Sequence, residues 1–281
     1  MIRLTKIVLI LNFLIFTHSV FPQIAPGYMG KRLILEYSGS TAPALFRQNQ
    51  NGNDGLFSWN YGHKITANYS LNRKTAIGVS FELYKTGTDY SNVYLEKSTN
   101  DAFGYDNYIT YRATGTEASP LGYTGIVNIK GISIFKAKYQ NGIAPHGKHS
   151  ILGLKLLFVS TDLSNVKFVG SNNNNYQNET LYYDLPKGGM NTLEWGFFYG
   201  VGVNRIISDK IVVSTGFELA FIISALGEWT KDWTNNYDFS NDSYNQNGVR
   251  TEEDLFKKIS TERVFSSQFF NLKIGIGFLA Y

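Results

Sequence analysis

The chain has 281 residues, a formal net charge of +4, no cysteine, and 15% aromatic residues. Because cysteine is absent, disulfides, thiolate metal sites, thiol catalysis and a lipid anchor on an N-terminal cysteine are excluded. The positive charge is small and dispersed, which argues against nucleic acid as a partner.

The first residues have the pattern of a secretory signal peptide. Arg3 and Lys6 form a positively charged start, residues 7–16 form a largely apolar core, and small residues follow it. We predict a cleaved signal at residues 1–22 and a mature domain at residues 23–281. No later segment approaches the roughly 18 apolar residues that a membrane helix needs. The mature chain is therefore expected to be a soluble exported β-protein or a transmembrane β-barrel.

Eight segments alternate apolar residues with polar or small ones at a period of two, the pattern of β-strands whose faces meet different surroundings. In chain order, these predicted strands cover residues 31–38, 59–71, 75–84, 129–140, 150–161, 191–204, 211–223 and 266–281. In the sixth, Leu193, Trp195 and Phe197 share one face, while the opposite face is rich in glycine and carries Glu194. The aromatic face suits lipid, and the small face suits a narrow barrel interior.

The connections between these strands alternate between long and short. Turns at residues 72–74, 141–149 and 208–210 are short, whereas loops at residues 39–57, 86–127, 162–190 and 224–265 are long. Bacterial outer-membrane barrels have short periplasmic turns, long external loops and an even number of strands. A soluble lipocalin-like barrel would instead place its large apolar residues inside. We therefore predict an all-β fold, an eight-stranded antiparallel up-and-down transmembrane β-barrel in the cell outer membrane.

Charged residues of both signs fall on the strand faces that we predict to line the barrel. They are Arg32, Glu36, Lys64, Glu82, Lys136, Lys155, Glu194, Glu218 and Lys273. An eight-stranded barrel is only just wide enough for side chains to fill it, and isolated buried ions are very costly. We expect a polar network with trapped water that blocks wide passage. The alternative is a narrow or gated ion path.

Three histidines follow the predicted signal peptide. His63 lies near the outer end of the second strand, on the lipid side and without an evident serine and carboxylate partner. His146 and His149 lie in the periplasmic turn before the fifth strand. A lipid-modifying enzyme would need its nucleophile and base near the outer leaflet. We therefore predict surface positions for all three, and no enzymatic activity, metal site or cofactor.

The last long loop contains a predicted helix. Thr251 and the acidic residues after it match a capping box, and Leu255, Phe256 and Ile259 form a small apolar stripe. Two interpretations remain open, a solvated helix that steadies the loop and a lid over the barrel mouth.

The long loops also contain aromatic residues that we predict to form an exposed binding surface, or an interface girdle where they lie close to lipid. They are Tyr90, Tyr94, Tyr105, Tyr108, Trp229, Trp233, Tyr237 and Tyr244. Aromatic, asparagine-rich loops suit adhesive or protein-binding surfaces.

With its signal sequence, eight strands and glycine- and aromatic-rich segments, the chain resembles the small outer-membrane β-barrel superfamily of OmpA and OmpX type. Its loops are similar to those of Bacteroidota barrels, including PorT-like ones. The resemblance covers about residues 30–281, and Tyr281 is similar to the terminal aromatic residue of such barrels. It implies a protein surrounded by outer-membrane lipid whose external loops bind a surface protein, a glycan or a secretion-system component. A narrow channel and a lipid-modifying enzyme are the alternatives.

Overall fold

The computed structural model describes residues 27–44, 49–53, 58–88, 94–100, 106–113, 125–140, 143–163, 167–172, 179–185, 189–225, 248–249 and 251–280. The predicted signal peptide and Tyr281 lie outside these residues. Among the described residues, no helix is both long and apolar enough to cross a membrane.

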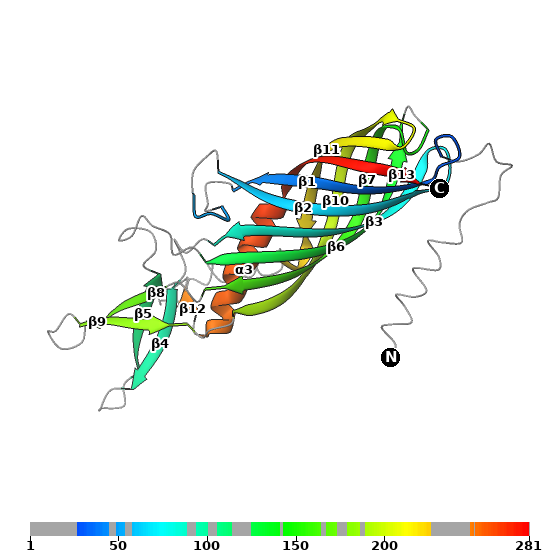
Figure 1. Cartoon of the computed structure of the whole chain (residues 1–281). Helices are drawn as coiled ribbons and strands as arrows, with labels where there is room; N and C mark the ends of the chain where they lie inside the picture. Colours follow the sequence, from blue (N-terminus) through cyan, green and yellow to red (C-terminus); the bar gives the residue numbers. More distant parts are fainter. Residues whose placement is uncertain are drawn as a thin grey trace, which may run out of the picture.

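Eight strands close into one antiparallel barrel (Figure 1). In chain order they are β1 (Leu33–Pro43), β2 (Trp59–Ser70), β3 (Thr75–Gly87), β6 (Ile126–Tyr139), β7 (Gly147–Asp162), β10 (Met190–Ser208), β11 (Ile211–Ile222) and β13 (Phe270–Ala280). Each strand pairs with the next barrel strand along the chain, and β1 pairs with β13 to close the ring. The predicted up-and-down barrel is confirmed.

The outer wall of the barrel is apolar. On β10, the side chains of Leu193, Trp195 and Phe197 are 56%, 47% and 45% exposed, while Phe198 on the other face is fully buried. The remaining barrel strands also carry exposed large apolar residues. A closed barrel leaves no strand edge unpaired, as lipid requires. The apolar belt outside and the charges inside therefore identify a transmembrane barrel rather than a soluble one.

Glycines on the inner face make room for two aromatic rings in this narrow interior. The Phe135 ring meets the Phe198 ring edge to face, with 6.2 Å between the centroids. A Cβ atom added to Gly78 would overlap the Phe135 ring, and one added to Gly153 would overlap the Phe198 ring. The rings and glycines together fill the middle of the barrel.

Two of the predicted loops contain further strands. These are β4 (Tyr94–Asn100), β5 (Asp106–Ala113), β8 (Lys167–Asn172) and β9 (Glu179–Asp184), and with β12 (Gly248–Val249) they form a five-stranded sheet in the order β12-β4-β5-β8-β9. The sheet lies beyond one end of the barrel, opposite the end that holds the short turns (Figure 1). By the rule for such barrels, the turns are periplasmic and this sheet is extracellular.

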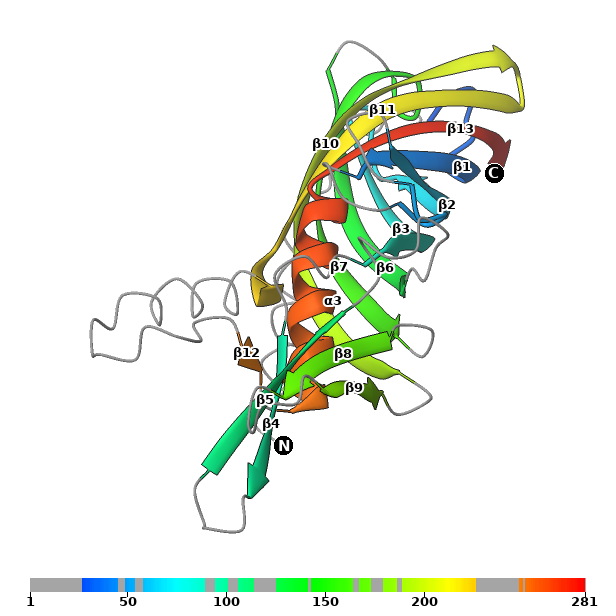
Figure 2. The same ribbon diagram turned by 90° about the vertical axis from the view of Figure 1, so that its left-hand side faces the viewer.

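Helix α3 (Glu252–Gln268) connects the extracellular sheet to the barrel (Figure 2). Thr251 accepts a hydrogen bond from the Asp254 backbone N–H at 3.1 Å, so the predicted N-cap is confirmed. The helix runs to Gln268, which corrects the predicted start of the last strand at residue 266. The alternation of apolar and polar residues begins only at Phe270, which is where β13 begins.

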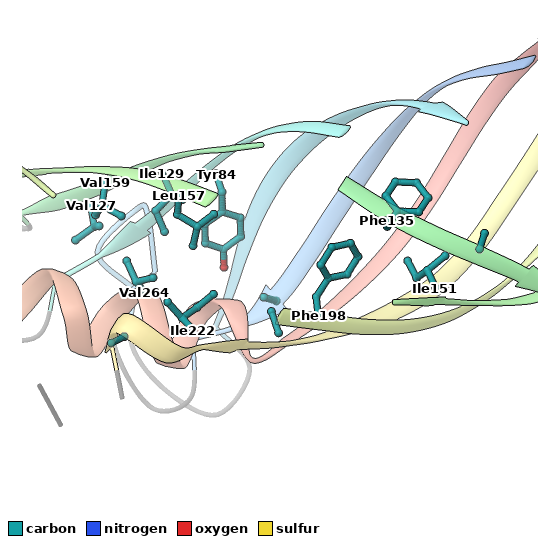
Figure 3. Close-up of a cluster of buried hydrophobic side chains, with 14 of the residues drawn as sticks. Tyr84, Val127, Ile129, Phe135, Ile151, Leu157, Val159, Phe198, Ile222 and Val264 are labelled. Carbon is teal, nitrogen blue, oxygen red and sulfur yellow. The ribbon is translucent and has the colours of Figure 1, made fainter. Parts of the chain in front are cut away.

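The two halves of α3 are buried in two different clusters. Leu255, Phe256 and Ile259 pack with residues of the extracellular sheet, including Leu95 and Phe168. Val264 instead packs inside the barrel mouth, in the cluster of Tyr84, Val127, Ile129, Leu157, Val159 and Ile222 (Figure 3). The interpretation of a solvated helix was therefore wrong, and α3 plugs the extracellular mouth.

Candidate functional site

Four buried charges meet in the lumen below α3. The Lys64 Nζ atom lies 2.6 Å from Glu218 Oε2. The Lys155 Nζ atom lies 3.1 Å from Glu82 Oε2 and 3.3 Å from Glu218 Oε1. All four residues are at most 8% exposed. The cluster contains two cations and two carboxylates, so its formal charge is balanced, which is what makes their burial tolerable.

An aromatic ring and the end of α3 complete this lumen cluster. The Phe198 ring centroid lies 5.4 Å from Lys64 Nζ and 5.5 Å from Lys155 Nζ, within the range of cation–π attraction. Lys155 also donates a hydrogen bond to Gln268 Oε1 at 3.1 Å. The last residue of the mouth helix is thereby connected directly to the lumen cluster.

A second polar layer lies nearer the periplasmic end. Lys273 Nζ is 3.2 Å from Glu36 Oε1. The amides of Asn68 and Asn204 donate to the Tyr139 hydroxyl, each at 3.4 Å. Below this layer, the buried side chains of Ile34, Val212 and Leu279 form an apolar cluster on the adjacent strands β1, β11 and β13.

Two small cavities lie between these layers among the residues that the structure describes. One cavity of about 20 Å³ is lined by Glu36, Lys64 and Lys273 among others. A second, of about 10 Å³, also contacts Lys64 and Lys273 and lies against Glu218 and Gln268. A cavity of about 10–15 Å³ holds a single water molecule. The interior thus has room for individual waters between its ion pairs, as expected of a polar plug.

The structure places seven of the nine predicted lumen residues inside the barrel: Glu36, Lys64, Glu82, Lys155, Glu194, Glu218 and Lys273. Arg32 precedes β1 at the periplasmic end, where it is half-buried and lies 3.5 Å from the Tyr69 hydroxyl. Lys136 is exposed on the outer wall, so its assignment to the lumen was wrong. On β6 the aromatic residues Phe135 and Tyr139 face inward, and Gly78 and Gly153 leave space for the Phe135 ring.

The histidine predictions divide in the same way. His63 is exposed on the outer wall, as predicted, and its Nδ1 lies 2.6 Å from the Tyr37 hydroxyl. His149 was predicted at the surface, but it is buried in the lumen beside the Tyr139 ring, with 5.1 Å between centroids. The strand β7 begins at Gly147, so His149 belongs to the barrel wall. The prediction placed His149 in the turn because Pro145 and Gly147, which are typical turn residues, lie just before it.

Sequence reasoning missed Arg263, a buried charge of α3 that anchors the helix in the mouth. Its Nε donates to the Gly87 carbonyl at 2.7 Å and its Nη2 to Thr86 Oγ1 at 2.5 Å. Both acceptors lie at the extracellular end of β3. Ile259 and Arg263 are four residues apart and so lie on the same face of the helix. This spacing could have predicted that Arg263 is buried with the apolar stripe.

Polar contacts to Glu252 also hold the extracellular sheet to α3, beside its apolar cluster. Lys97 Nζ of β4 lies 2.7 Å from Glu252 Oε1, and the Tyr183 hydroxyl of β9 donates to the same oxygen. The Lys97 ammonium also lies 5.3 Å from the Tyr183 ring centroid. Hydrogen bonds from Lys97 and Tyr183 lower the pKa of Glu252 to about 2.

This contact should depend on pH over a defined acidic range. The ordinary pKa of the Glu252 carboxyl is 4.5, so its contribution is complete above about pH 4.5 and is lost as the pH falls towards 2. We expect hydrogen exchange at the start of α3, corrected for intrinsic rates, to differ between wild type and Glu252→Gln at neutral pH. The difference should shrink through this range. The exposed Glu253→Gln is the control, and an equal effect of both variants would contradict the assignment.

Two of the eight predicted loop aromatics lie in the extracellular sheet. Tyr94 in β4 pairs with Arg112 of β5 and with Gly248 of β12, and Tyr108 in β5 pairs with Ser98. Six lie outside the described residues: Tyr90, Tyr105, Trp229, Trp233, Tyr237 and Tyr244. Among the described residues, no group of three or more metal-ligating side chains could hold an ion.

The chain is similar to two solved structures. Neisserial surface protein A (NspA) is 9% identical, with a TM-score of 0.38 over 89% of this chain and 97% of that chain. Ail, the attachment invasion locus protein of Yersinia pestis, solved with the heparin analogue sucrose octasulfate, is 9% identical, with a TM-score of 0.39 over 88% of this chain and 98% of that chain. No protein-family model and no curated protein matches the sequence.

A closed barrel with an apolar outer belt and a polar interior is the arrangement that lipid requires of a membrane-spanning sheet. The chain is an integral outer-membrane β-barrel protein.

Proposed function

We propose that this protein binds a partner protein at the cell surface through its extracellular sheet, and that the barrel serves as the membrane anchor. The observation that carries this proposal is the continuous path from lumen to sheet through α3. Gln268 contacts the lumen cluster, Arg263 is anchored to β3, and Glu252 is bound to β4 and β9. Because these contacts hold the extracellular sheet to the barrel, the sheet offers a stable binding surface above the membrane.

The interior favours an anchor over a channel. The ion pairs of Lys64 and Lys155 and the Phe198 ring occupy the same level of a barrel whose mouth is filled by α3. Passage of a hydrated ion would require breaking buried ion pairs, which is strongly unfavourable. We expect the purified protein to give no defined conductance steps in planar bilayers. Reproducible single-channel steps would support the channel alternative.

The edge of the extracellular sheet favours a protein as the partner. Among the described strands, β9 pairs with β8 alone, and its Tyr182 side chain is 71% exposed. An edge strand offers backbone donors and acceptors that another chain can pair with. An exposed tyrosine beside that edge is a residue type enriched at protein interfaces.

The binding proposal is tested by photo-crosslinking on intact cells. A photoreactive phenylalanine analogue at Tyr182 should form a discrete adduct with an extracellular protein, which mass spectrometry identifies. The same analogue at Tyr69, which is exposed on the barrel wall near the periplasmic end, is the matched control. A purified, identified partner should bind wild type at least tenfold more tightly than Tyr182→Ser. Equal adducts at both positions, or equal affinity of both proteins, would contradict the proposal.

A further inference from the structure

Positively charged residues are concentrated at the periplasmic end of the barrel, far from the extracellular sheet of the proposed function. Its described residues are 27–33, 71–76, 136–140, 143–150 and 204–211. They include nine cations: Lys31, Arg32, Arg73, Lys74, Lys136, Lys138, Lys148, Arg205 and Lys210. The only carboxylate among these described residues is Asp209. Since the whole chain has a net charge of +4, the charge is strongly polarised along the barrel axis.

Five of these cations form one exposed group around the periplasmic end of β6. We call this group the β6 basic patch; it consists of Arg73, Lys74, Lys136, Lys138 and Lys148. Backbone pairing brings them together. Lys138 pairs with Thr75, the residue after Lys74, and the Tyr139 N–H donates to the Lys74 carbonyl at 2.7 Å. The Gln140 N–H donates to the Lys148 carbonyl at 3.0 Å. The turn before β3 and the strands β6 and β7 therefore contribute to a single patch.

The β6 basic patch lies immediately below the lipid-facing belt. In the barrel register, Lys136 is flanked by Ile77 of β3 and Leu152 of β7, which are 46% and 62% exposed on the outer wall. Ile134, two residues further into the membrane on the same face, is 59% exposed. Lys138 follows at the level of Thr75 and Ser150, where the apolar wall ends. Long lysine side chains at such a border place their stems against apolar surface and their ammonium groups among lipid headgroups.

The patch has no carboxylate partner among the described residues. Ion pairs among the described residues involve lysines outside the patch: Lys64, Lys97, Lys155 and Lys273. Five exposed cations close together, without internal partners, attract anions strongly at low ionic strength.

We propose that the β6 basic patch binds the phosphate groups of anionic phospholipids in the periplasmic leaflet. The outward orientation of Lys136 and Lys138, in line with the apolar belt, favours lipid over a soluble periplasmic ligand. Such binding would fix the depth and rotation of this side of the barrel, independently of what the extracellular sheet binds.

The chain offers a matched control nearer the extracellular end of the barrel wall. Lys130 of β6 and Lys85 of β3 are also exposed on the outer wall, but near the extracellular end, where Lys130 pairs with Leu83 and Lys85 with Asn128. The variants Lys136→Gln/Lys138→Gln and Lys85→Gln/Lys130→Gln therefore remove the same charge from opposite ends.

The experiment is native mass spectrometry of the detergent-solubilised protein with equimolar phosphatidylglycerol and phosphatidylcholine. Wild type should retain phosphatidylglycerol preferentially, and added salt should weaken the preference. Lys136→Gln/Lys138→Gln should reduce the preference at least fivefold, and Lys85→Gln/Lys130→Gln less than twofold. Heat-modified gel migration establishes that both variants are folded.

Two outcomes would overturn the proposal. One is an unchanged lipid preference in Lys136→Gln/Lys138→Gln, and the other is an equal loss in both variants, which would indicate general charge attraction. Co-sedimentation with purified peptidoglycan distinguishes the competing ligand. If the first variant loses sedimentation but keeps its lipid preference, the patch binds peptidoglycan carboxylates instead.

Discussion

Replacing Lys155 with methionine is expected to lower the free energy of unfolding by about 3–5 kcal/mol, the usual cost of removing one partner of a buried ion pair. Lys155 is 2% exposed and contacts Glu82, Glu218 and Gln268. Without it, two buried carboxylates share the single cation of Lys64. Reversible urea unfolding in lipid vesicles measures the loss.

A double variant separates lost packing from unbalanced charge. Lys155→Met/Glu82→Gln restores a balanced cluster, leaving the Lys64–Glu218 pair at 2.6 Å intact. We expect it to recover most of the stability lost in Lys155→Met, since burying neutral groups of similar size costs little compared with an unpaired charge. If the double variant is less stable than Lys155→Met, charge balance is not what stabilises the lumen.

Replacing Arg263 with methionine should release α3 from the barrel mouth while the barrel itself stays folded. The variant removes the donors to Gly87 and Thr86 and leaves two buried acceptors without them. Hydrogen bonds from a charged donor contribute roughly 1.5–3 kcal/mol each. Losing two corresponds to an increase of about 100-fold or more in hydrogen exchange across the C-terminal half of α3.

The exposed Glu253→Gln, on the first turn of the same helix, is the control for this experiment. It should leave exchange at residues 260–268 unchanged. Exchange in β6 and β7 should be the same in both variants, because these strands pair with each other along their length. If Arg263→Met unfolds the barrel strands together with α3, the helix belongs to one cooperative unit with the wall and is not a separable plug.

Lys155→Met and Arg263→Met both test how α3 is held in the barrel mouth. Lys155 contacts the last residue of α3 from inside the barrel, and Arg263 holds the helix five residues earlier, nearer the extracellular side. A release of α3 should therefore also weaken any binding at the extracellular sheet, since Leu255, Phe256 and Ile259 form part of its core. Loss of stability in the lumen and loss of binding at the surface are predicted to be coupled.

The errors of sequence reasoning have local physical causes. On β6, apolar residues occupy both faces, Ile132 and Ile134 outside and Phe135 inside, so alternation by itself left the direction of Lys136 ambiguous. The strands β8 and β9 have six residues each, too few for a clear period. They are stabilised by packing against α3, a helix from a distant part of the chain.

The sequence by itself determined the membrane-spanning barrel, because a period of two with apolar and polar faces is a local property that each strand carries along its own length. It also determined the start of α3, since an N-cap involves only neighbouring residues. Only the tertiary structure decided that α3 enters the mouth, that Lys64 and Lys155 balance Glu82 and Glu218, and that the loops form a sheet. These features depend on contacts between residues far apart in the chain, and such contacts are set only when the ring of strands closes.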